Sequence, residues 1–380
     1  MSTETPAGAG FAGAADLGPA RVARLDATGQ FAAAATLGDQ LEEAWRLSFA
    51  ALEGVALSPA GYRPNGVAVC GMGGSAIGGD VVKACLTELP VPCEVVRGYD
   101  LPAWVSPRTL VIAVSYSGDT EETLSCVSAA LARECRPVCV TSGGTLEALA
   151  RERGLPLIAV PAGHQPRAAM GLLAAPVGAV VEAAGLATGF AAQVDEAAGL
   201  ARELAAQLAP EAATERNPAK RLALRLHGRL PVIYGGGLTG VAARRFKSQL
   251  NENADAVAFW AELPELNHNE LVGWSGIDEA ARGLYVVIFV DHAASDPIKR
   301  RVELTRELVA RHAAGVEVLE TRGEAALTRV LSLTYLGDYA SLYLAMLRGI
   351  DPAPVEAIDW LKRRMAGDES ASLPDAPRRA

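Results

Sequence analysis

The feature that most constrains the fold is an alternation of short apolar runs with helical patterns. The run VAVCG at 67–71 ends in a glycine-rich turn, GMGGSAIGGD, which leads into the apolar-periodic VVKACL. Further apolar runs follow at 93–96, 110–114, 138–141 and 157–160, and most are separated by helical patterns. Near-continuous Val and Ile runs between helices are typical of a parallel sheet buried on both faces. The sequence therefore predicts a doubly wound α/β domain.

The same alternation returns in the second half of the chain. RLPVIYGGGLTGVAARRFKSQL at 229–250 has Gly235 and Gly237 where the first run has Gly71 and Gly73. LYVVIFV at 284–290 and VEVLET at 316–321 match the later runs of the first half. A repeat of about 130 residues has the size of one domain, which indicates an internal duplication. We therefore predict two tandem doubly wound parallel-sheet domains.

The pattern also predicts where these domains begin and end. Helices are expected at about 20–57, 167–182, 193–208, 325–347 and 354–365, and PEAATERNP at 210–218 is the best linker candidate. The predicted segments are a disordered tail at 1–18, N-terminal helices with the first sheet domain at 19–210, a second sheet domain at 211–350, a C-terminal helix at 351–366 and a disordered tail at 367–380.

Charge and cysteine usage exclude several classes of protein. The chain of 380 residues has a net charge of −9 and no extended basic tract, which argues against a nucleic-acid partner. Its six cysteines include no CxxC pair, as expected for a reduced cytoplasmic protein without a metal cluster. The N-terminus lacks the charged and apolar regions of a signal peptide, and no apolar run is long enough to predict a membrane span.

Two loops of the first domain are candidates for binding a phosphate. A glycine-rich turn that opens a helix presents backbone N–H groups to an anion, and the helix dipole adds to the attraction. Tight turns and N-caps alone would explain one such loop easily, but they explain two hydroxyl-rich loops in one domain less well. Both loops follow the carboxyl ends of parallel strands, so we expect them to flank one crevice. No acidic residue closes the second run to hold a ribose, so a small phosphate ligand is favoured over a nucleotide. The candidate residues are Gly73, Gly74, Ser75, Ser115, Ser117 and Thr120.

The second copy differs at the corresponding loop. It has Asp291, His292 and Asp296 where the first has its hydroxyl cluster, so only the first copy is expected to bind an anion.

The stretch from Arg244 to Glu270 is rich in groups that move protons. Glu252 stands near the end of an amphipathic helix, and His268 lies in the loop that follows a short apolar segment. A carboxylate and an imidazole near one sugar carbon can act as base and acid. The alternative is the polar end of a surface helix beside a solvated turn, and the stretch alone favours that alternative.

Several motifs together resemble a known family. SYSGDTEET with GMGGSAIGGD resembles the sugar isomerase (SIS) domain, whose hydroxyl-rich loop holds a sugar phosphate. HQPRAAMG, FKSQLNENA and ELPELNHNE extend the resemblance to the bifunctional phosphoglucose/phosphomannose isomerase family, over roughly residues 20–365. The resemblance implies two flavodoxin-like SIS domains and isomerisation of glucose 6-phosphate and/or mannose 6-phosphate to fructose 6-phosphate through an enediol. It also implies a homodimer that uses neither metal nor cofactor.

Residue roles follow from the same motifs. The resemblance implies that Glu252 is the base that moves a proton between C1 and C2, and that His268 opens the sugar ring, by analogy from the other subunit. It implies that Arg167 stabilises the enediolate and that Lys362 assists at the ring oxygen. These roles suit the side chains, because arginine stays charged when partly buried and histidine exchanges protons near neutrality.

Two positions depart from the family pattern. Position 119 is Asp where Asn is usual, and we expect its side chain to cap the helix that directly follows it. The segment DPAPVEAIDWLK has no Ser or Thr near Lys362, which puts dual glucose and mannose activity in doubt. Two rival functions stay open: an SIS-type regulator that binds a sugar phosphate without turnover, and an isomerase of amino-sugar phosphates.

Overall fold

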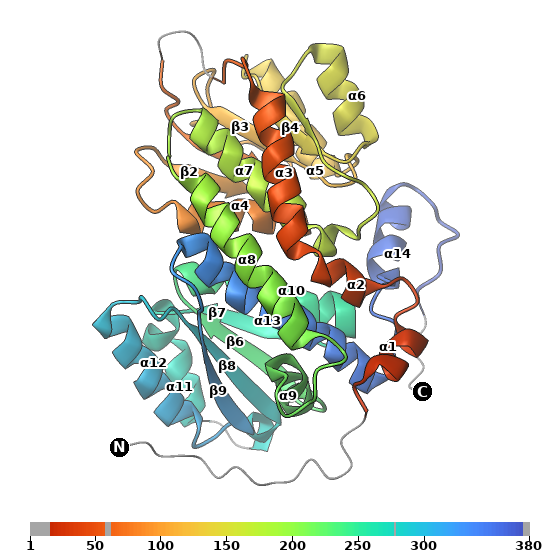
Figure 1. Ribbon diagram of the computed structural model, residues 1–380, viewed down its shortest axis with the longest axis vertical. Coiled ribbons are helices and arrows are strands. Elements are labelled where there is room, and N and C mark those ends of the chain that lie inside the picture. Colours follow the sequence, from red (N-terminus) through yellow and green to blue (C-terminus); the bar gives the residue numbers. More distant parts are fainter. Residues whose placement is uncertain (1–15, 58–61, 277–278, 375–380) are drawn as a thin grey trace.

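The computed structural model describes residues 16–57, 62–276 and 279–374 of the chain (Figure 1). Residues 1–15 of the first predicted tail and residues 375–380 of the second lie outside the described residues. The predicted domain limits stay a prediction, and the limit between 210 and 211 falls in the turn that separates α8 (Phe190–Leu208) from α9 (Pro218–Leu226).

The first half of the chain forms a five-stranded parallel sheet. Its strand order is β2-β1-β3-β4-β5, the flavodoxin-like doubly wound order. Alternate residues of β1 face opposite layers: Val67 and Val69 join the core beneath α4 and α7, whereas Ala68 and Cys70 pack toward α5. The strands are β1 (Val67–Cys70), β2 (Cys93–Val96), β3 (Leu110–Val114), β4 (Val138–Thr141) and β5 (Leu157–Ala159). The helices are α3 (Leu37–Leu52), α4 (Gly73–Cys85), α5 (Glu121–Ala132), α6 (Gly144–Arg153) and α7 (Met170–Ala183), with the short turn η1 (Pro166–Ala168) before α7.

The second half repeats the arrangement with four parallel strands. The order β7-β6-β8-β9 matches β2-β1-β3-β4, so the predicted fold class of two tandem parallel-sheet domains is confirmed. Ile233 of β6 faces α10 and α13, whereas Val232 faces the layer of α11 and α12. The strands are β6 (Leu230–Gly235), β7 (Phe259–Glu262), β8 (Leu284–Val290) and β9 (Gly315–Glu320). The remaining elements are α10 (Leu238–Ala254), η2 (Glu265–His268), α11 (Glu270–Ser275), η3 (Glu279–Gly283), α12 (Asp296–Val309), α13 (Ala326–Arg348) and α14 (Glu356–Met365).

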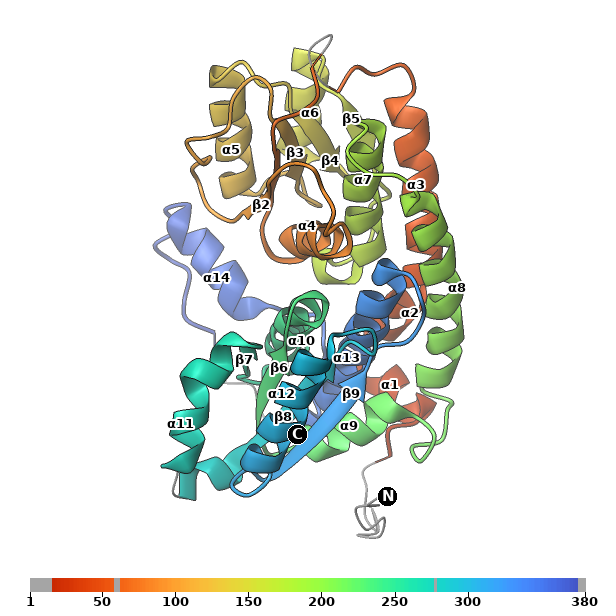
Figure 2. The same cartoon turned by 90° about the vertical axis from the view of Figure 1, so that its left-hand side faces the viewer.

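A shared layer of helices joins the two sheets. In Figure 2, α4 of the first domain lies next to α10 of the second, and the two helices are in contact. Helices α1 (Pro19–Leu25) and α2 (Gln30–Ala35) precede the first sheet in sequence but pack on α13 of the second domain. The ring of Phe31 in α2 packs edge-on against Tyr339 and at a tilt against Tyr343, with centroids 6.0 and 4.9 Å away. One continuous apolar core therefore runs through both domains.

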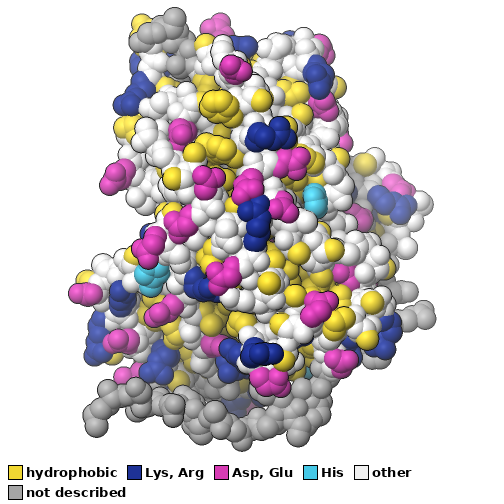
Figure 3. All heavy atoms as spheres, in the orientation of Figure 1, with side chains coloured by type: hydrophobic (Ala, Val, Ile, Leu, Met, Phe, Trp, Pro, Cys, Tyr) yellow, Lys and Arg dark blue, Asp and Glu magenta, His cyan; other side chains and the backbone are white. Residues whose placement is uncertain are grey.

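Helices α13 and α14 differ in how much of their surface is covered. Among the described helices, α13 has the length and apolar composition to cross a membrane, yet 89% of its apolar window is buried inside the protein. Helix α14 has no buried residue and lies at the edge of the molecule, apart from both sheets (Figures 1 and 2). On the face seen in Figure 3, acidic and basic side chains are mixed over both domains.

Candidate active site

Arg167 is the centre of the candidate site. Its side chain is buried in η1, between the two domains, and its exposed fraction is 4%. Nε donates to Oδ1 of Asn253 at 2.7 Å, and Nη2 donates to the carbonyl oxygens of Pro352 and Ala353, also at 2.7 Å. Nη1 lies 3.9 Å from Oε2 of Glu252. The fold therefore brings the predicted enediolate partner next to the predicted base.

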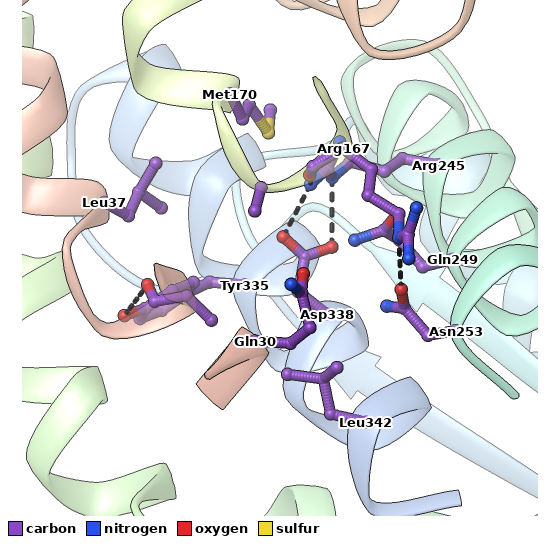
Figure 4. Close-up of a pocket in the computed structure, with 12 residues that line it drawn as sticks. Gln30, Leu37, Arg167, Met170, Arg245, Gln249, Asn253, Tyr335, Asp338 and Leu342 are labelled. Carbon is purple, nitrogen blue, oxygen red and sulfur yellow. Dashed lines mark hydrogen bonds and ion pairs between the residues drawn. The ribbon is translucent and has the colours of Figure 1, made fainter. Parts of the chain in front are cut away.

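A buried ion pair holds the backbone of Arg167 (Figure 4). Arg245 of α10 donates to both carboxylate oxygens of Asp338 in α13, at 3.0 and 2.8 Å. Its Nη2 also donates to the carbonyl oxygen of Arg167 at 2.7 Å. Asn253 donates to Ser341, which in turn donates to the carbonyl oxygen of Asp338. Two side chains of α10 thus bind the backbone and the guanidinium of Arg167, and one turn of α13 anchors both of them.

Burial sets the electrostatics of this network. Loss of solvent lowers the pKa of Arg167, and the negative charge of Glu252 opposes that shift. Burial also raises the pKa of the Asp338 carboxyl, while the charge and hydrogen bonds of Arg245 favour its ionised form. Because Arg245 supplies a hydrogen bond to each carboxylate oxygen, we describe the pair as ionised.

The first glycine-rich turn lies directly beside Arg167. Gly73 has a φ of 51°, in the region that favours glycine. A Cβ on Gly74 would stand 2.7 Å from the carbonyl oxygen of Pro166, so a larger residue there would displace the Arg167 turn. Oγ of Ser75 accepts a hydrogen bond from the backbone N–H of Tyr116 at 3.3 Å. The N-terminus of α4 therefore touches both the Arg167 turn and the loop after β3.

The predicted hydroxyls of the loop after β3 lie close together. The side-chain oxygens of Ser115 and Thr120 are 2.9 Å apart, and the N–H of Gly118 donates to Oγ of Ser115 at 3.1 Å. Ser115 is fully buried, whereas Ser117 is exposed and accepts a hydrogen bond from the N–H of Asp119. The predicted phosphate-binding residues thus lie at one edge of the first sheet, beside the N-termini of α4 and α5.

The prediction that Asp119 caps the helix directly after it is wrong. The carboxylate of Asp119 does not cap α5, the helix that follows it, but accepts from the backbone N–H and the hydroxyl of Thr145 at 2.9 and 2.7 Å. Thr145 lies in the first turn of α6, and its N–H lowers the pKa of Asp119. Close packing causes the difference, since a Cβ on Gly118 would stand 1.9 Å from the carbonyl oxygen of Gly143. The carboxylate therefore serves a neighbouring helix.

A cleft of about 160 Å³ opens between α4 and α10. Glu252 and Arg167 line it at the end where Gly73 and Gly74 stand. Its remaining lining residues are Ile77, Arg97, Arg244, Arg245, Ser248 and Gln249.

The sequence analysis did not identify three arginines that line this cleft, Arg97, Arg244 and Arg245. For Arg97 the sequence holds one usable signal, its position directly after the apolar run at 93–96, at the carboxyl end of a parallel strand. Arg244 and Arg245 had none, because a helical pattern does not show which polar face meets the other domain.

His268 and Lys362 do not line this cleft in the described chain. His268 is exposed at the end of η2, and no hydrogen bond of its imidazole occurs among the described residues. Lys362 is exposed on α14. Their predicted roles stay predictions.

In the second domain, the loop that begins at Asp291 corresponds to the hydroxyl-rich loop of the first, and its polar groups contact residues of the same domain. Oδ1 of Asp291 lies 3.1 Å from Nε of Arg329 and accepts a hydrogen bond from the hydroxyl of Thr321 at 2.9 Å.

No group of three or more His, Cys, Asp or Glu side chains within 16–57, 62–276 and 279–374 is arranged to hold a metal ion.

Comparison with known proteins decides the family. A bifunctional phosphoglucose/phosphomannose isomerase from Caldicellulosiruptor bescii is 39% identical over 304 residues, which cover 79% of this chain and 89% of the relative. The chain belongs to the bifunctional phosphoglucose/phosphomannose isomerase family. The family's relative from Aquifex aeolicus is 35% identical, over 79% of this chain and 90% of its own length.

Two further comparisons support the SIS architecture. The family profile described as the bacterial phospho-glucose isomerase C-terminal SIS domain matches residues 215–365. A hypothetical protein from Thermus thermophilus superposes with a TM-score of 0.72 at 19% identity, covering 93% of both chains. At that identity the superposition supports the shared fold alone.

Proposed function

We propose that this chain interconverts glucose 6-phosphate and/or mannose 6-phosphate with fructose 6-phosphate. The observation that carries the proposal is a buried guanidinium, that of Arg167, 3.9 Å from the carboxylate of Glu252 and beside the glycine turn at Gly73 and Gly74. A phosphate held by the hydroxyl-rich loops would leave the sugar chain directed along the cleft toward this pair. That arrangement provides a base and a fixed positive partner for one reaction centre.

In the proposed mechanism the carboxylate of Glu252 removes the C2 proton of the open-chain aldose. The electrons of the C–H bond form the C1–C2 double bond of an enediolate, and the negative charge develops on O1. Arg167 stabilises that charge, because burial strengthens its interaction with a developing oxyanion. Glu252 then returns the proton to C1 while the O2 proton passes to O1, which gives the ketose. No step requires a metal or a cofactor, and we propose that none is used.

We further propose a homodimer in which His268 completes the site of the partner subunit. Support comes from the exposed position of His268 and from three exposed apolar side chains in the neighbouring elements. These are Val257, Phe259 of the edge strand β7 and Val272 of α11. A second copy that covers them would bury apolar surface and bring His268 to a cleft other than its own. We also propose that Lys362, on the exposed α14, assists at the ring oxygen. A cytoplasmic location is proposed as well.

An activity assay tests the proposed reaction. Purified protein should convert fructose 6-phosphate to at least one of the two aldose 6-phosphates at an unchanged rate after treatment with EDTA. Separate coupled assays for glucose 6-phosphate and mannose 6-phosphate measure the epimer preference. Binding of the hexose phosphates without turnover would instead favour the regulator. Loss of turnover that zinc restores would indicate a metal-dependent isomerase.

The phosphate assignment predicts a particular split of kinetic parameters. Ser117→Ala and Thr120→Ala should each raise KM more than they lower kcat, because contacts far from C1 and C2 bind substrate and transition state alike. Steady-state kinetics with fructose 6-phosphate measure the split. Ser128→Ala is the matched control, since the hydroxyl of this exposed serine of α5 donates to the carbonyl oxygen of Leu124, in its own helix. An unchanged KM in both loop variants would contradict the assignment.

A further inference from the structure

A second cluster of arginines stands at the end of the cleft away from Glu252. Arg97 follows β2, and Arg244 belongs to α10. Both lie against Asp80 of α4: Arg97 donates a hydrogen bond to Oδ2 of Asp80, and Nη1 of Arg244 lies 3.5 Å from the same oxygen. The proposed reaction uses none of these three side chains.

The charges of this cluster do not cancel. Two guanidiniums share one carboxylate oxygen, which leaves one positive charge in excess. Burial lowers the pKa of Arg244, and the nearby charge of Arg97 lowers it further. In the described part of the chain, one hydrogen bond to Asp80 is the only one that the donors of these two side chains make. Most of their N–H groups are therefore free to bind a phosphate, whose oxygens match the planar donor fork of arginine.

The topology places this cluster opposite the hydroxyl-rich loop. Strand β1 lies between β2 and β3 in the first sheet. The carboxyl edge therefore presents Arg97 after β2, the glycine turn after β1 and Ser115 to Thr120 after β3, in that order. A ligand that crosses the glycine turn has one end at the hydroxyls and the other at the arginines.

The length of α10 gives the spacing between the reaction centre and this cluster. Arg244, Ser248 and Glu252 all line the cleft, at intervals of four residues along α10. At the rise of an α-helix, the backbones of Arg244 and Glu252 are about 12 Å apart. The cleft therefore extends beyond the reaction centre, and Arg97 and Arg244 lie past the C1 end of a sugar whose 6-phosphate is at the hydroxyls.

We propose that Arg97 and Arg244 form a second anion subsite, which binds the C1 phosphate of a hexose bisphosphate. This inference rests on the proposed function, because that function puts the first phosphate at Ser115 to Thr120. A hexose with phosphates on both terminal carbons then occupies both ends of the cleft. It excludes the monophosphate substrate and acts as a competitive inhibitor.

Calorimetric titration of the full-length protein with fructose 1,6-bisphosphate and fructose 6-phosphate tests the subsite. Wild type should bind the bisphosphate about tenfold more tightly than the monophosphate, as charge-assisted hydrogen bonds predict. Arg97→Gln should bring this affinity ratio close to one, because Asp80 then neutralises Arg244. Asp80→Asn should raise the ratio, because it leaves both guanidiniums without a counter-charge. Arg225→Gln is the control, since Arg225 pairs with Glu317 on the second sheet.

The opposite signs separate this subsite from a structural ion pair between the domains. If the cluster only fastens α4 to α10, both variants lower the melting temperature and neither changes the affinity ratio, which overturns the proposal. A ratio near one in the wild type also overturns it. If fructose 6-phosphate itself does not bind, the proposed function falls rather than the subsite alone, and free inorganic phosphate titrated into wild type and Arg97→Gln then tests the arginines directly. Equal phosphate binding by those two proteins overturns the subsite.

Discussion

Glu252→Gln should lower kcat by about 10²- to 10⁴-fold, the usual loss when a general base is removed. Glutamine keeps the volume of the side chain, and Glu252 is partly exposed on α10, so the variant should fold. Phosphate binding and ring opening are assigned to other groups, so the variant should still bind sugar phosphate. Deuterium at C2 should then stop exchanging with solvent, which NMR measures after long incubation.

Glu265→Gln is the matched control for this loss. Glu265 lies in the same stretch, is exposed, and accepts a hydrogen bond from the amide of Asn269 at 2.9 Å. Its variant should keep near wild-type turnover. Full turnover and exchange in Glu252→Gln, together with their loss in Arg167→Ala, would show that the base is another group, with Glu262, Glu265 and Glu270 as candidates.

Mixed subunits extend the test to His268. Glu252→Gln and His268→Ala homodimers should both be inactive. If His268 acts in the partner's site, a mixed dimer contains one intact site, so a randomised mixture should recover about a quarter of wild-type activity. A mixture that stays inactive after subunit exchange would place His268 in the site of its own chain or outside it.

Asp338→Ala should lower the free energy of unfolding by about 3–5 kcal/mol, the cost of leaving one partner of a buried ion pair uncompensated. Arg245 and Asp338 are 3% and 8% exposed, so water cannot replace the lost carboxylate easily. Urea unfolding measures the change. The exposed pair of Arg300 and Glu303 is the control, and Glu303→Gln should cost less than about 1 kcal/mol.

The double variant Arg245→Met/Asp338→Leu separates stability from catalysis. Replacing both partners of a buried ion pair with apolar side chains is often neutral for stability. We therefore expect the double variant to regain much of the lost unfolding free energy but to have a lower kcat than wild type, because the carbonyl of Arg167 has lost its donor. Recovery of both stability and kcat would mean that the pair does not position Arg167.

The sequence alone determined the elements and the nature of the candidate site. The apolar runs at 67–71 and 229–235 predict strands because burial on both faces of a parallel sheet requires such runs. The glycine turns predict the tight entry into α4 and α10, and the motifs predict that Glu252 and Arg167 share a site. These inferences concern neighbouring residues or motifs, and information of this kind is local.

Only the tertiary structure decided which distant groups meet. Asp119 caps α6 rather than α5 because the loops at Gly118 and Gly143 are in contact, and no periodicity encodes that contact. The Arg245–Asp338 pair and the cluster of Arg97, Arg244 and Asp80 form where α10 packs against α13 and α4. A helical pattern shows that a polar side chain leaves the apolar face of its helix. The partner of that polar side chain depends on how whole helices and sheets pack. Packing buries the apolar faces, and the polar groups at their edges are brought together as a consequence.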